Sequence, residues 1–127
     1  MAYNGNITDY AKQYISATDV TDDLKTFFSR DTGINVVQTG AGEAAAGVLW
    51  YAQGTTNAAV SVIAGGQPDV LVGTGGVSAG DEVASDANGA AVVAVSSDVV
   101  LGIARHDAAE DELVRIEFLG EAQYTKA

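Results

Sequence analysis

Residues 81–93 read DEVASDANGAAVV, and they repeat a pattern that occurs first as TFFSRDTGINVV at residues 26–37. Two apolar segments follow each copy in the same order. The first copy is followed by AAGVLWY (45–51) and AAVSVI (58–63), and the second by VLGIARH (100–106) and ELVRIEF (112–118). We therefore predict one β motif used twice, in residues 24–63 and 80–118.

The distances between matching residues support the duplication. The spacing is 56 between Gly33 and Gly89, 55 between Gly47 and Gly102, and 54 between Val62 and Ile116. Loops tolerate changes in length, whereas paired strands do not. A spacing that drifts by one residue per loop is thus expected for two copies that share their strands and differ in their connections.

The apolar residues alternate as they do in strands with one buried face. Val114, Ile116 and Phe118 alternate with Arg115 and Glu117 in the last segment. Glycines in DTG and DANG supply the positive φ that tight turns need, so each copy is expected to begin with a hairpin.

We expect a common core formed by Val36, Val48, Val60, Val93, Ile103 and Val114. Adjacent strand residues point to opposite faces, so one of Trp50 and Tyr51 should be buried and the other exposed or in a subunit interface.

Turn signals recur every 8–12 residues, which predicts an all-β fold. The chain of 127 residues fits a single small β-barrel or sandwich domain, which we place at residues 24–127. Helix is expected only in short pieces, at residues 10–16 or 42–46.

The first 23 residues differ from the body of the chain. They are polar and carry isolated large apolar side chains: Tyr3, Ile7, Tyr10, Tyr14 and Ile15. This composition predicts an N-terminal arm at residues 1–23 that contributes more to partner binding than to folding. The alternative is that the segment packs on its own domain.

Composition excludes several classes of function. The chain has no cysteine, and its 6 basic and 17 acidic residues give a net charge of −11. Such a chain is unsuited to binding nucleic acid, which requires clustered Lys and Arg. No signal peptide or membrane-spanning segment is apparent, so we expect no membrane partner.

No motif predicts catalysis, a cofactor or a metal. GAGEAA at residues 40–45 lacks the long helix that a dinucleotide-binding site needs, and GTGGVSAGD at residues 73–81 lacks the Lys of a phosphate-binding loop. His106 is the only histidine, so a metal site or a catalytic triad built around it and Asp107 is disfavoured. We interpret His106 as the end of a strand before an acidic loop, and we expect no enzymatic activity.

Residues 76–119 resemble the C-terminal half of the small decoration, or cement, proteins of tailed-bacteriophage capsids. The resemblance rests on VSAGDEVASDANGAAV and on VLGIARHDAAEDELV, and it extends more loosely through GEAAAGVLWYA. It implies a β-tulip or small-barrel fold and a place on the outer capsid surface of the virion, after synthesis in the host cytoplasm. The implied partners are the major capsid protein and other copies of the chain, commonly as a homotrimer and in some relatives as a dimer.

A cement protein stabilises the head by binding alone, because separation of the capsid subunits must also break its contacts. The arm, with Tyr3, Ile7, Tyr10, Tyr14 and Ile15 as anchors, suits addition of a strand to a sheet edge of the capsid protein. The main alternative is a carbohydrate- or receptor-binding β module that uses Trp50, Tyr51 and Arg105. A small β-barrel enzyme that uses His106 and Asp107 is a third hypothesis.

Overall fold

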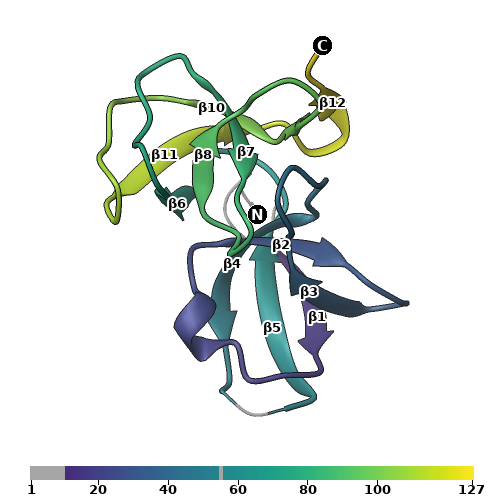
Figure 1. The fold of residues 1–127 in the computed structure, drawn as a ribbon. Helices are drawn as coiled ribbons and strands as arrows, with labels where there is room; N and C mark the ends of the chain where they lie inside the picture. Colours follow the sequence, from purple (N-terminus) through teal and green to yellow (C-terminus); the bar gives the residue numbers. More distant parts are fainter. Residues whose placement is uncertain (1–10, 55) are drawn as a thin grey trace, which may run out of the picture.

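The computed structural model describes residues 11–54 and 56–127, which form two β-rich halves (Figure 1). The first half is a closed five-stranded barrel in the order β1-β3-β2-β4-β5. Its strands are β1 (Ala11–Ser16), β2 (Phe27–Arg30), β3 (Asn35–Gln38), β4 (Gly47–Ala52) and β5 (Ala58–Ile63). We call residues 11–63 the barrel half and residues 64–127 the C-terminal half.

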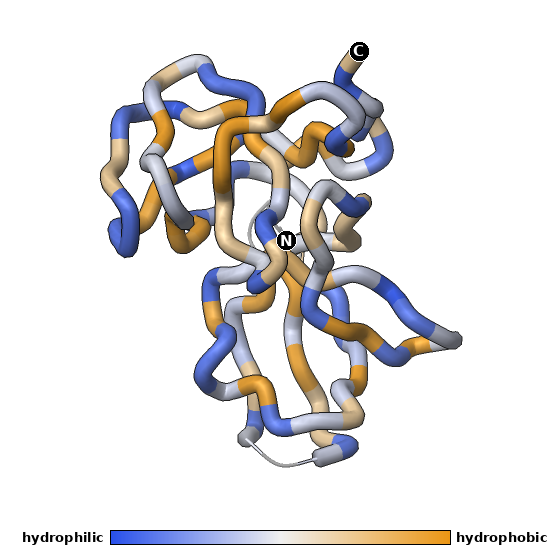
Figure 2. Tube along the Cα trace, in the orientation of Figure 1, coloured by the Kyte–Doolittle hydropathy of each residue, from blue (hydrophilic) through white to orange (hydrophobic). Residues whose placement is uncertain are grey.

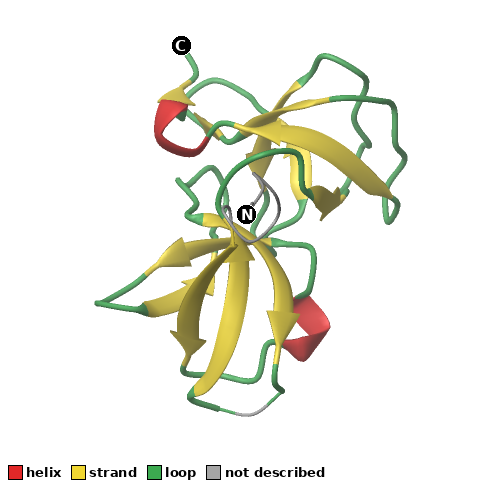
Figure 3. Cartoon of the chain, turned by 180° about the vertical axis from the view of Figure 1, so that it is seen from behind, coloured by secondary structure: helices red, strands yellow, loops and turns green. Residues whose placement is uncertain are grey.

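The C-terminal half contains a five-stranded sheet in the order β6-β11-β10-β7-β8 and a two-stranded sheet of β9 and β12. The strands are β6 (Asp69–Leu71), β7 (Glu82–Ser85), β8 (Ala91–Val93), β9 (Val99–Val100), β10 (Gly102–Ala104), β11 (Leu113–Phe118) and β12 (Tyr124–Thr125). Helical structure in the described residues is limited to two 3₁₀ turns, η1 (Thr21–Asp23) and η2 (Gly120–Ala122), which Figure 3 shows in red. The all-β prediction is confirmed.

The two halves have the same strand order. The series β1-β5-β4-β2-β3 matches β6-β11-β10-β7-β8, and every corresponding pair within these series is antiparallel. The first and last strands of each series also meet. In the barrel half β1 runs parallel to β3, and in the C-terminal half a parallel bridge joins Val72, which follows β6, to Ala91 in β8. The duplicated motif is therefore larger than the sequence pattern indicated, because β1 and β6 belong to it.

Backbone hydrogen bonds fix the alignment of the two copies. Asp31 N donates to Asn35 O, as Asp86 N donates to Ala90 O. Both hairpin turns therefore have the same length, and equivalent residues of the two copies lie 55 positions apart. Gly33 corresponds to position 88, so its predicted match with Gly89 is wrong by one residue. Gly33 and Gly89 both have positive φ, 59° and 76°, but at successive places in the turn.

The change in spacing from 55 to 54 comes from a β-bulge. The register of β4 against β5 shifts between Leu49 and Tyr51, and no such shift occurs between β10 and β11. Trp50 is the extra residue. The bulge breaks the alternation of faces, so Trp50 and Tyr51 are both exposed, by 38% and 51%. The prediction that one of them is buried is wrong.

The hydrophobic side chains form two main cores rather than one. The barrel core consists of Val20, Phe28, Val36, Leu49, Val60 and Val62. The second core fills the C-terminal half around Val70, Val83, Leu101, Val114 and Ile116. The predicted common core is therefore divided, and Val93 is 45% exposed because its strand position is equivalent to that of the half-buried Gln38.

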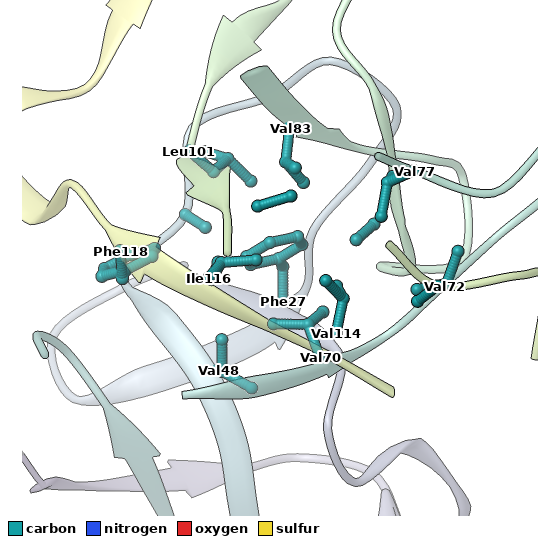
Figure 4. Packing of buried hydrophobic residues seen from close by; sticks show 14 residues of the cluster. Phe27, Val48, Val70, Val72, Val77, Val83, Leu101, Val114, Ile116 and Phe118 are labelled. Atoms are coloured by element: carbon teal, nitrogen blue, oxygen red, sulfur yellow. The ribbon is translucent and has the colours of Figure 1, made fainter. Parts of the chain in front are cut away.

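Phe27 joins the halves. It belongs to the barrel strand β2, yet it is fully buried in the second core and its ring stacks on Phe118 with centroids 6.4 Å apart (Figure 4). Its neighbour Phe28 is fully buried in the barrel core. Phe27 N also donates to Gly89 O at 2.8 Å, which holds the β7–β8 turn against the barrel.

The alternation predicted for the last segment is confirmed in β11. Val114, Ile116 and Phe118 are buried, whereas Arg115 and Glu117 are exposed. Figure 2 shows the same division along the chain, with hydrophobic positions in the strands and many hydrophilic ones in the loops.

Candidate functional site

Part of the segment predicted as an N-terminal arm belongs to the barrel. Residues 11–16 form β1, which pairs along its whole length with β5, and Ser16 and Val20 are buried. Residues 11–16 contain few apolar side chains, but they form a strand of a larger sheet. The segment therefore does not have to form a hydrophobic core by itself. The boundary at residue 23 and the possible helix at residues 10–16 are both wrong, and residues 42–46 form no helix.

The five predicted capsid-binding residues separate into three groups. Tyr3, Ile7 and Tyr10 lie outside the described residues. Tyr14 is partly buried against the barrel core, so it is part of the fold. Ile15 is half-buried on the opposite side of β1.

The barrel presents an outer wall formed by β4, β5, β1 and β3. Tyr51 and Gln13 both lie directly opposite Ser61, so the three share one face of the sheet. Val60 and Val62, the neighbours of Ser61, point into the barrel core, so this face is the outside. Gln13 Nε2 donates to Ser61 Oγ at 2.9 Å, which joins two side chains of the central row.

The wall continues across β1 to β3. Ile15 lies opposite Ala59 on one side and opposite Asn35 on the other. Val37, two residues beyond Asn35, lies on the same face and is 47% exposed. The predicted residues Tyr51 and Ile15 thus share one surface, with Trp50 at its edge. The sequence pattern does not reveal this surface, because the polar composition of residues 11–16 predicts an arm and not a barrel strand.

The acidic residues gather elsewhere. Residues 11–63 contain five acidic and three basic side chains, whereas residues 64–127 contain eleven acidic and three basic. None of the sixteen acidic residues in the described part of the chain lies in a barrel strand, where the charged residues are Lys12 and Arg30. The wall is therefore free of carboxylates in a strongly acidic chain.

A hollow of about 430 Å³ in the C-terminal half contains three carboxylates. Each of them accepts a backbone hydrogen bond: Asp81 from Ser78 N, Asp107 from Ala79 N and Glu112 from Ala109 N, at 2.8–2.9 Å. These carboxylates hold the loops in shape. Among the described residues, no three His, Cys, Asp or Glu side chains are placed to hold a metal ion together.

His106 also has a structural role in the same loop. It is exposed, Arg115 N donates to its Nε2 at 3.1 Å, and its Nδ1 lies 2.9 Å from Asp107 O. Arg105, a candidate for carbohydrate binding, forms an exposed ion pair with Glu117 at 3.6 Å. None of the helical segments in the described residues has the length and apolar character to span a membrane.

No family model and no curated protein matches the sequence. The fold is similar to that of a solved structure, "head fiber gp8.5 N base in bacteriophage phi29". The TM-score is 0.70, the sequences are 18% identical, and the match covers 85% of this chain and 92% of that chain. The fold of this chain is therefore also found in another protein, and the similarity covers nearly the whole length of that protein's chain.

Proposed function

We propose that the chain is a structural protein of a bacteriophage head, an exterior decoration protein that binds the lattice of the major capsid protein. The observation that carries the proposal is the shared fold with the base of a phage head fiber, over 92% of that chain. The resemblance of DEVASDANGAAVV and VLGIARHDAAEDELV to capsid decoration proteins supports the same role independently, because it rests on sequence.

The proposed mechanism is binding without turnover. The protein bridges neighbouring capsid subunits, so pressure from packaged DNA must break its contacts as well as those of the shell. As a homotrimer it would make three weak contacts with the capsid at once, which raises the overall affinity by roughly 10²–10⁴ through effective concentration. No cofactor takes part.

The distribution of charge suits this role. The C-terminal half holds most of the acidic residues, and an acidic surface favours solubility at high local concentration. An exterior position would expose that half to solvent, with the nearly neutral barrel half available for contacts with protein.

Addition of the purified protein to expanded empty capsids that lack it tests the proposal. The expected result is stoichiometric uptake at symmetric sites and a higher temperature of capsid rupture. A truncated chain without residues 2–10 should bind more weakly, because Tyr3, Ile7 and Tyr10 are removed. Absence of uptake, or rupture at the same temperature with and without the protein, would leave a carbohydrate- or receptor-binding module as the better account.

A further inference from the structure

The two hydrophobic cores differ in where their residues come from. The second core takes Phe27, Ala45 and Val48 from the barrel half, in addition to its own residues. Figure 4 shows Phe27 among the buried side chains of the C-terminal half. In the opposite direction, no described residue of the C-terminal half belongs to the barrel core. The C-terminal half therefore depends on the barrel half for part of its core, and the dependence is not mutual.

The hydrogen bonds that close the two halves differ in the same way. In the barrel half, β1 and β3 bind each other directly, because Ile15 N donates to Ile34 O at 2.9 Å. The parallel contacts between the first and last strands identify the equivalent residues: Ser16 with Val72, Val36 with Ala91, Ile15 with Leu71, and Ile34 with Gly89.

In the C-terminal half, the equivalent atoms do not bind each other. Leu71 N donates to Lys25 O at 2.8 Å, and Gly89 O accepts from Phe27 N at 2.8 Å. Residues 25–27 of the barrel half therefore bridge β6 and the β7–β8 turn, beyond the point where β6 and β8 meet. They act as a short strand that completes the closure of the C-terminal half.

Loss of this segment would affect the two halves unequally. Gly89 is buried, so its carbonyl would lose a hydrogen bond away from water. Phe27 is fully buried in the second core, so its departure would also leave a cavity there. The barrel would lose neither its closing hydrogen bond from Ile15 nor a residue of its own core.

We infer that the gap between β6 and the β7–β8 turn is a strand-acceptor site, that residues 25–27 of the same chain are its ligand, and that this contact couples the halves in one direction. The C-terminal half can open while the barrel stays closed, but the barrel cannot open without opening the C-terminal half. The inference goes beyond the proposed function and does not rest on capsid binding.

Native-state amide hydrogen exchange of the full chain, measured residue by residue in low urea, tests the inference. The amide of Phe27 is the most informative, because it belongs to a barrel strand and donates to Gly89 O. It should exchange together with the amides of Leu101 and Ile116, and faster than the barrel amide of Val62. Exchange of Phe27 together with Val62 would overturn the inference.

A matched pair of variants tests the direction of the coupling. Val60 and Val114 occupy equivalent places in β5 and β11, and both are buried. Val114→Ala destabilises the folded chain relative to both the half-open and the unfolded state, so protection should fall about tenfold or more in β11 and in β5. Val60→Ala destabilises the folded and half-open states equally. Protection should therefore fall in β5 and stay unchanged in β11.

Other kinds of coupling give other patterns. Loss of protection confined to the substituted half in both variants would mean that the halves open independently. Loss throughout the chain in both variants would mean a single cooperative unit. Loss throughout the chain for Val60→Ala, with loss in β11 alone for Val114→Ala, would mean that the C-terminal half holds the barrel closed. Each of these three patterns would overturn the inference.

A substitution at Gly89 locates the acceptor site. A Cβ there would lie 3.0 Å from Phe27 O and 3.1 Å from Thr26 Cβ. Gly89→Ala should therefore lower the protection of the Phe27 amide and of both halves, as Val114→Ala does. Gly33→Ala is the control, because Gly33 also has positive φ in a hairpin turn but no atom lies within 4 Å of the added Cβ. It should lower protection in the barrel half alone. Unchanged protection of the Phe27 amide in Gly89→Ala would show that residues 25–27 do not fill the site.

Discussion

Gly47 and Gly102 occupy the same place in the two halves, each against a strand that carries buried core residues, β5 and β11 respectively. A Cβ on Gly47 would lie 2.3 Å from Ile63 O and 2.5 Å from Val62 Cγ1, and one on Gly102 would lie 2.7 Å from Glu117 O and 2.9 Å from Ile116 Cδ1. Val62 and Ile116 are fully buried, one in each core. The two glycines thus let the strands approach closely enough to fill both cores.

Substitution of either glycine by alanine should destabilise the protein by about 1–3 kcal/mol or more, because the new methyl group meets backbone that cannot move aside cheaply. Gly47→Ala should be the more severe, since its contact is shorter. Urea denaturation measures the difference. Gly33→Asn is the control: its φ of 59° suits Asn, and no atom lies within 4 Å of the added Cβ. A larger loss for the control would contradict this account of the glycines.

Phe27→Ala should cost about 3–5 kcal/mol, because it leaves a cavity where the barrel meets the second core. Val37→Ala, on the exposed wall, should stay within about 0.5 kcal/mol. Thermal unfolding followed by circular dichroism measures both changes. Similar melting temperatures for the two variants would mean that Phe27 does not hold the halves together.

Deletion of residues 2–16 should prevent folding, because it removes β1, which closes the barrel between β3 and β5. Deletion of residues 2–10 should leave the melting temperature nearly unchanged, as expected for a segment used in partner binding. Thermal melts of the two truncated chains make the comparison. A stable fold without β1 would restore the original prediction of an arm that reaches residue 23.

Stability should fall in acid through Glu82. Lys126 Nζ and Tyr124 Oη both donate to its carboxylate, and these hydrogen bonds hold the pKa of Glu82 below its ordinary value of 4.5. Because the folded state binds the proton less tightly than the unfolded one, this stabilisation is present above about pH 4.5 and is lost as the pH falls through the folded pKa. Glu82→Gln should therefore be less stable than the unmodified chain at neutral pH.

The comparison with Glu82→Gln should be made by urea denaturation from pH 2 to pH 11. The difference between the two proteins should shrink in acid. Glu82 also raises the pKa of Tyr124 above 10.0, so that contribution is present below pH 10 and is lost as the pH rises through the folded pKa. A difference that stays constant from neutral pH into acid would contradict the assigned role of Glu82.

Phe27 and Glu82 occupy equivalent places in the two halves but make different contacts. Ala94 N donates to Glu82 O, as Thr39 N donates to Phe27 O, so Glu82 is the counterpart of Phe27. Phe27 inserts into the next half, whereas Glu82 binds the C-terminal Tyr124 and Lys126. The same strand position is thus apolar and buried in the barrel half, and charged and hydrogen-bonded to Tyr124 and Lys126 in the C-terminal half.

The sequence by itself determined the all-β class, the repeated motif and the buried face of β11. These properties depend on local patterns: the alternation of Val114, Ile116 and Phe118, and glycines with positive φ in the hairpin turns. The net charge of −11 likewise predicts, without reference to the fold, that nucleic acid is not a partner. The resemblance to capsid decoration proteins was visible for the same reason, because it lies in contiguous stretches.

Only the tertiary structure decided the place of residues 11–16, the exposure of Trp50 and Tyr51, and the division of the core. β1 pairs with β5, whose partner residues lie 42 to 52 positions further along the chain, and such pairing leaves no local signal in a polar segment. The bulge depends on the register of β4 against β5, and a shift of one residue changes which side chains face the core. Phe27 and Phe28 look equivalent in the sequence, and they fill different cores because β2 lies between the two halves.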